Sequence, residues 1–220
     1  MRRLAPAVAV LTIQAATLAA QGRGLREVRP EGYGGLHVVV AQPLGEFRHT
    51  GDWSAGLTGF LLFGGAGLGL RLDGGYLQYD SDYRGYGVTT SSSVGSLGLG
   101  PQLTLGHGRL RAYGFATLGG SFFWTALTED GYCGCYDGDT FFLNGRFTTT
   151  TQLGTGLLIV ISRRRPVALD LGVRDVRHAR VRYVPAGGIT DHGDGSYSVE
   201  RVETPVRMRV FQVGVSIGLR

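Results

Sequence analysis

The feature that most constrains this chain is a series of eight segments in which apolar residues alternate with polar residues or glycine. The segments cover residues 35–43, 54–63, 67–79, 91–105, 109–126, 147–162, 166–183 and 205–219. An alternation with a period of two predicts β-strands that each have one apolar face. The chain has 220 residues, 38 of them glycine. We therefore expect one all-β domain.

The connections between these segments alternate in length. Only residues 64–66, 106–108 and 163–165 separate the second from the third segment, the fourth from the fifth and the sixth from the seventh. The other connections are longer and polar. This alternation is typical of an eight-stranded antiparallel up-and-down transmembrane β-barrel of the bacterial outer membrane, with short periplasmic turns and long extracellular loops.

The N-terminus supports export. Residues 1–20 read as a cleaved signal peptide: Arg2 and Arg3 precede an apolar stretch at 4–13, and small residues follow at 17–20. A membrane anchor is the alternative, but the apolar run is shorter than the roughly 20 residues that a spanning helix needs. We expect a barrel domain over residues 21–220, exported through the Sec pathway to the outer membrane.

Opposite faces of the segments differ in character. In the third segment Leu68, Leu70 and Leu72 alternate with Arg71 and Asp73. The apolar face suits lipid and the polar face suits a lumen, and the seventh segment repeats the pattern. For residues 109–126 and 147–162 both faces carry apolar or small residues, so their phase stays open.

Four charged residues fall on the inward faces, and an eight-stranded barrel is only wide enough for its own side chains. Buried charges persist only when they are paired and hydrogen-bonded. A structural charge network that fills the lumen is the favoured interpretation, and a switchable gate for ions is the alternative. The four residues are Arg71, Asp73, Asp170 and Arg174.

Aromatic residues gather where the strands meet the long loops, as in the interfacial girdle of a membrane barrel. A soluble β-sandwich or a lipocalin-like barrel is the alternative, because these folds also alternate. The predicted girdle consists of Trp53, Tyr76, Tyr79, Trp124, Phe147 and Tyr183.

With its leader, its eight segments and the run Gly67-Leu-Gly-Leu-Arg-Leu-Asp-Gly-Gly-Tyr76, the chain resembles the outer-membrane β-barrel family, which includes the OmpA transmembrane domain and the OmpX and OmpW barrels. The resemblance implies a monomer inserted by the barrel-assembly machinery. Members of the family usually end in an aromatic residue that this machinery reads, whereas here Leu219 takes its place and Arg220 follows.

The loop at residues 128–139 contains the only two cysteines, Cys133 and Cys135. A loop disulfide is one interpretation, although a single intervening residue makes a strained ring, and free thiols are another. Two thiolates do not complete a zinc site. We predict no metal site and no cofactor.

A hydrolase would need a serine, a histidine and an acid held together. Nothing in the spacing of residues 91–93, His178 and Asp175 joins them, so no catalytic residues are predicted. The net charge of +5 carries no nucleic-acid pattern. We expect a non-enzymatic barrel that anchors exposed loops for envelope structure or surface interaction, with outer-membrane lipids and lipopolysaccharide as partners. A passive channel for small or hydrophobic molecules is the alternative, and a lipid A-modifying enzyme is a remote one.

Overall fold

The structure is a computed structural model that describes residues 31–49, 51–64, 67–83, 88–106, 108–129, 140–162, 167–185, 188–192 and 196–219. The predicted signal peptide at residues 1–20 lies outside these described residues, as do Cys133 and Cys135.

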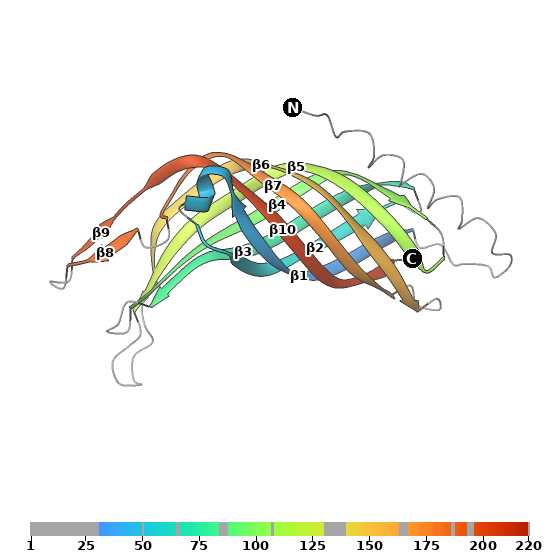
Figure 1. Cartoon of the computed structure of the whole chain (residues 1–220), viewed down its shortest axis with the longest axis horizontal. Helices are drawn as coiled ribbons and strands as arrows, with labels where there is room; N and C mark the ends of the chain where they lie inside the picture. Colours follow the sequence, from blue (N-terminus) through green and yellow to red (C-terminus); the bar gives the residue numbers. More distant parts are fainter. Residues whose placement is uncertain are drawn as a thin grey trace, which may run out of the picture.

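Eight long strands close into one antiparallel barrel, in the order β1-β2-β3-β4-β5-β6-β7-β10 around the wall, and β10 pairs with β1 to complete it (Figure 1). A 3-10 helix, η1, follows β1, and a small hairpin of β8 and β9 lies between β7 and β10. The predicted fold is confirmed. The bounds are β1 Gly32–Leu44, η1 Gly45–His49, β2 Ser54–Phe63, β3 Leu68–Tyr83, β4 Val88–Leu105, β5 Leu110–Glu129, β6 Thr140–Ser162, β7 Val167–Tyr183, β8 Ile189–Asp191, β9 Tyr197–Val199 and β10 Val202–Leu219.

The two ends of the barrel differ. Figure 1 shows the β8–β9 hairpin beyond the left end of the barrel, whereas β10 ends at the right. The right end carries the short turns, and two of these use glycines with positive φ: Gly64 and Gly67 between β2 and β3, and Gly106 and Gly108 between β4 and β5. Glycine adopts this backbone conformation without steric cost, so these connections can be tight.

At the other end the strands run further than predicted. β6 begins at Thr140 instead of residue 147, and β3 and β4 extend until only residues 84–87 separate them. The long loop expected at residues 80–90 is therefore largely strand. The apolar alternation that marks a strand in the sequence does not continue through these extensions, so the pattern alone does not predict them.

The outward face of the barrel is an apolar belt. Its large side chains are exposed, as the lipid-facing surface of a barrel must be. The exposed belt residues include Leu36, Val38 and Val40 on β1; Leu57, Leu61 and Phe63 on β2; Leu68 and Leu70 on β3; Leu97, Leu99, Leu103 and Leu105 on β4; Leu110 and Leu118 on β5; Leu153, Leu157, Ile159 and Ile161 on β6; and Phe211, Val213, Val215, Ile217 and Leu219 on β10.

The sequence does not determine which faces of β5 and β6 point inward, and the buried side chains of the structure do. Tyr113, Phe115 and Phe123 on β5 and Leu158 and Val160 on β6 point inward and are buried. The sequence is ambiguous here because large apolar side chains occupy the inside as well as the outside of these two strands.

Among the described residues no helix is long and apolar enough to cross a membrane.

Candidate functional site: the barrel interior and its extracellular rim

A fully buried arginine on β3 begins the interior network. The guanidinium of Arg71 donates through Nε and Nη2 to the carboxylate of Asp73, with Nη2–Oδ1 at 3.0 Å, and through Nη1 to Oε1 of Gln102 at 2.7 Å. The rings of Phe60 and Phe115 lie 4.0 and 4.1 Å from the guanidinium carbon. Arg71 is therefore stabilised by a bidentate carboxylate and by cation–π contact with both rings.

A second arginine crosses the lumen. Arg174 on β7 donates from Nη1 to Oδ1 of Asp73 at 3.1 Å and to Oε1 of Gln152 at 3.0 Å, and from Nη2 to Oγ1 of Thr58 at 3.2 Å. Its Nε donates to Oε1 of Gln212 at 2.9 Å. Asp73 thus lies between two guanidiniums, which satisfies its buried charge.

Gln212 connects Arg174 to the second buried carboxylate, that of Asp170. Gln212 Nε2 donates to the hydroxyl of Tyr113 at 2.8 Å, and this hydroxyl donates to Oδ1 of Asp170 at 2.6 Å. Ser216 Oγ donates to Oδ2 of Asp170 at 2.9 Å, and Nε2 of His37 lies 2.9 Å from the same oxygen. Here the carboxylate lies between the serine and the histidine, an arrangement that orders the interior but does not activate a nucleophile.

These contacts form one continuous network to which all eight barrel strands contribute. It includes the four residues predicted from the sequence, Arg71, Asp73, Asp170 and Arg174, all of which the structure places inside the barrel. The sequence places Gln102, Gln212 and Ser216 on inward faces without giving them a role, and the open phase of β5 and β6 hides Tyr113 and Gln152. The members are His37 on β1, Thr58 on β2, Arg71 and Asp73 on β3, Gln102 on β4, Tyr113 on β5, Gln152 on β6, Asp170 and Arg174 on β7, and Gln212 and Ser216 on β10.

An aromatic plug closes the extracellular mouth. Phe47 in η1 is completely buried, and its ring packs edge-on against Tyr79 at 5.7 Å and Tyr183 at 5.5 Å between centroids. Phe123 lies 6.1 Å from Tyr79 and 6.3 Å from Tyr183. We call these four residues, Phe47, Tyr79, Phe123 and Tyr183, the aromatic plug.

The plug corrects the sequence prediction for Tyr79 and Tyr183. The sequence predicts both in the membrane girdle, but only 1% and 0% of their surfaces are exposed, so they cannot contact lipid. Tyr79 follows the inward phase of Arg71 and Asp73 on β3. On β7 an extra residue is inserted near Ala179, where the register with β10 shifts, and this bulge turns Tyr183 inward.

Three girdle residues do lie on the outward face. Trp124 on β5 packs against Tyr76 on β3, with ring centroids 5.8 Å apart, and against Phe122 on β5, also at 5.8 Å. Phe147 on β6 pairs with Phe122 and is exposed. Trp53 is exposed in the connection before β2. An outward aromatic cluster therefore lies across β3, β5 and β6, as expected at a membrane interface.

A small void lies between the interior network and the aromatic plug. It is lined by residues that include Thr58, Gln152, Arg174 and His178, and its volume is about 20 Å³. A void of that size holds about one water molecule.

The extracellular rim carries outward-facing arginines above the apolar belt. Arg207 on β10 donates from Nη2 to Oδ2 of Asp175 on β7 at 2.7 Å and from Nε to Oδ1 at 3.2 Å, and Nη2 of Arg177 lies 3.5 Å from Oδ2. Arg207 and Arg209 keep the outward phase of β10. Arg182 forms an exposed pair with Glu203 at 3.3 Å.

The structure separates the residues weighed for catalysis. His178 is buried inside the barrel with its ring 5.0 Å from Phe123, whereas Asp175 on the same strand faces outward. Ser92 faces inward and shares a hydrogen bond with Thr125, and Ser93 shares one with Tyr76. The barrel wall therefore lies between this histidine and this acid. Within the described residues no cluster of three or more metal-ligating side chains occurs.

The eight strands form a closed barrel, the belt outside is apolar, and the charge network lies inside. The chain has the fold of an outer-membrane β-barrel. Similar solved structures include Neisserial surface protein A (14% identity, TM-score 0.49, 88% of this chain and 100% of that chain covered) and Ail of Yersinia pestis (11%, 0.44, 86% and 97%). Another is a major outer membrane protein from Thermus thermophilus (14%, 0.46, 84% and 98%). These values are too low to transfer a role to this barrel.

No protein-family model matches the sequence, and no curated protein matches it.

Proposed function

We propose that this barrel is a non-enzymatic outer-membrane protein with a closed lumen, which anchors its extracellular connections for envelope structure or surface interaction. The observation that carries the proposal is the interior network, because it joins side chains from all eight strands across the lumen. An ion would have to separate Asp73 from both guanidiniums to pass. Breaking such buried pairs costs several kcal/mol, on the order of 3 to 5 for the loss of one partner.

Two features support the outer membrane as the location. The outward belt is apolar on strands all around the wall, and arginines with exposed side chains, such as Arg177 and Arg207, stand directly above it. Guanidiniums at this level can pair with the phosphates of lipid headgroups, including those of lipopolysaccharide. The proposal includes export with the leader expected at residues 1–20 and insertion of the strands by the barrel-assembly machinery.

Passage of a small apolar molecule is the second candidate. The inner wall of the extracellular half is apolar, with Val39, Val94, Val176, Met208 and Val210 all buried there. The same residues, however, cluster with the aromatic plug, and the void lined by Val94, Val176, Met208 and Val210 among others has a volume of about 20 Å³. Passage would require the plug to move out of the mouth.

Two measurements on the refolded chain test the proposal. On cold detergent gels the folded barrel should migrate faster before boiling than after it, and in planar bilayers it should show no stepwise conductance. Conductance in the native protein would transfer the assignment to transport. Solubility without detergent, together with no heat shift, would refute the membrane barrel itself.

A further inference from the structure

The barrel wall opens between β6 and β7 at its extracellular end. Pairing of these two strands ends at Thr150 and His178, although both strands continue. Above this point the described part of β6 pairs only with β5, and the described part of β7 pairs only with β10. The two strands diverge and leave a seam in the outward surface.

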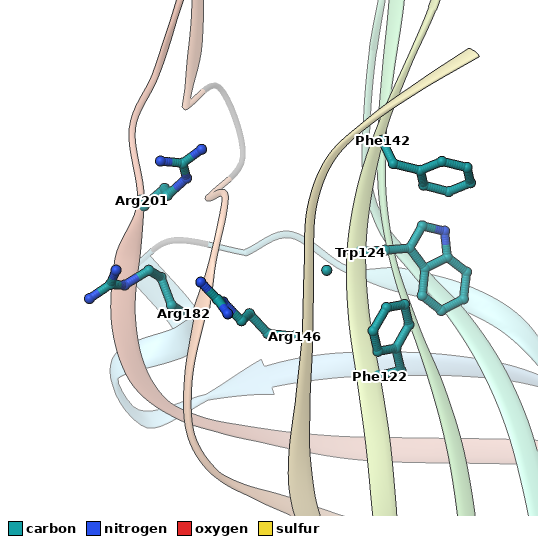
Figure 2. A pocket seen from close by; sticks show the side chains of 7 residues that line it. Phe122, Trp124, Phe142, Arg146, Arg182 and Arg201 are labelled. Carbon is teal, nitrogen blue, oxygen red and sulfur yellow. The ribbon is translucent and has the colours of Figure 1, made fainter.

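A cavity of about 440 Å³ lies at this seam. Figure 2 shows the guanidiniums of Arg146, Arg182 and Arg201 on one side of the β6 ribbon and the rings of Phe122, Trp124 and Phe142 on the other. Gly145 on β6, which has no side chain, also lines the cavity. The cavity is therefore cationic on one flank and aromatic on the other. We call this cavity the seam pocket.

The chemistry of the seam pocket selects an anionic ligand. Three guanidiniums come from three separate segments: Arg146 from β6, Arg182 from β7, and Arg201 from the residues just before β10. Arg182 is already paired with Glu203. Within the described residues neither Arg146 nor Arg201 has an acidic partner. A phosphate group presents several oxygens, so it can accept from more than one guanidinium.

The position of the seam pocket at the membrane interface favours a phosphate that belongs to a lipid. Phe122 and Trp124 belong to the outward aromatic cluster that marks the membrane interface, and Phe147 beside Phe122 extends this cluster along β6. Arg146 pairs with the inward-facing Phe123, so its guanidinium can reach an outer-leaflet lipid only through the gap between β6 and β7, whereas the rings face outward. A lipid would therefore place its headgroup at this gap and its glycerol or sugar portion against the rings. A soluble phosphate ion has no apolar part that could pack against the aromatic rings.

We infer that the seam pocket between β6 and β7 binds the phosphate headgroup of an outer-leaflet lipid. The inference rests on the outer-membrane location proposed above. It adds a defined lipid-binding site to a barrel whose apolar belt faces the membrane. Arg146 and Arg201 ligate the phosphate, and Arg182 contributes positive charge while it remains paired with Glu203.

The test uses the refolded full chain in zwitterionic detergent, with Trp53→Phe in the background so that Trp124 is the only fluorophore of its kind. Short-chain phosphatidic acid, short-chain phosphatidylcholine and inorganic phosphate are titrated separately while Trp124 emission is followed. Phosphatidic acid should bind at least about tenfold more tightly than either of the others. The double variant Arg146→Gln/Arg201→Gln should weaken that binding about tenfold or more, because it removes two charge-assisted contacts.

Arg109→Gln is the matched control, since Arg109 is an exposed arginine at the short-turn end and this variant should bind phosphatidic acid as the native chain does. Equal binding of inorganic phosphate and phosphatidic acid would overturn the lipid assignment, and an unchanged affinity in the double variant would overturn the site. Heat shift and bilayer conductance, measured on the same variants, report separately on the closed barrel. The seam pocket can therefore fail this test while the proposed function stands.

Discussion

Arg174 on β7 and Asp73 on β3 meet across the lumen, with 3.1 Å between Nη1 and Oδ1, although 101 positions separate them in the chain. Neither strand neighbours the other in the wall. This pair therefore holds opposite sides of the barrel together, and it can form only when the wall is closed.

Replacing Arg174 with methionine should destabilise the barrel by about 3 kcal/mol or more, because removal of one partner leaves Gln212, Gln152 and Thr58 with unmet acceptors in a buried site. Urea unfolding in lipid vesicles, followed by tryptophan emission, measures the change. Arg109→Gln serves as the exposed control. An unfolding free energy equal to that of the native chain would mean that the cross-lumen contact contributes nothing.

Asp170→Asn tests the second half of the network. The carboxylate accepts from Tyr113 at 2.6 Å and from Ser216 at 2.9 Å. An amide of the same shape brings two N–H donors against groups that already donate, so we expect a loss of about 2 to 3 kcal/mol. The same unfolding assay applies, and Ser216→Ala should cost less because it removes one neutral donor. A larger effect for Ser216→Ala than for Asp170→Asn would contradict this account of the network.

Phe47→Ala should remove the centre of the aromatic plug at a cost of about 3 to 5 kcal/mol, as for a buried phenylalanine. It should nevertheless not produce conductance, because the charge network still closes the lumen below. Only the double variant Phe47→Ala/Arg174→Ala should conduct in planar bilayers. Stepwise openings in Phe47→Ala alone would show that the plug is the sole barrier.

The exposed pair of Asp175 and Arg207 should behave differently from the buried pairs. Its side chains are 20% and 45% exposed, and such pairs contribute little to stability. Asp175→Asn should leave the unfolding midpoint within error of the native value, while Asp73→Asn in the same assay should lower it clearly. An equal decrease of the unfolding midpoint in the two variants would mean that the Asp175–Arg207 pair contributes as much to stability as a buried pair, and would contradict this prediction.

The sequence by itself determined the number of barrel strands, the up-and-down order, the outward faces of β3, β4, β7 and β10, and the inward location of Arg71, Asp73, Asp170 and Arg174. The physical reason is local. In a strand that separates lipid from a lumen, apolar and polar side chains must alternate with a period of two. This pattern can be observed directly in consecutive residues of the sequence.

Only the tertiary structure decided which inward side chains meet, because partners such as Arg174 and Thr58 are joined by closure of the wall and not by spacing in the chain. It also showed that Tyr79 and Tyr183 belong to the plug and not to the expected girdle: Tyr79 follows the inward phase of Arg71 and Asp73, whereas Tyr183 turns inward only because of the bulge on β7. The 3-10 helix that carries Phe47 places its ring against both tyrosines at the mouth. The seam pocket likewise exists only because β6 and β7 stop pairing above Thr150 and His178, which depends on where two strand edges diverge in space.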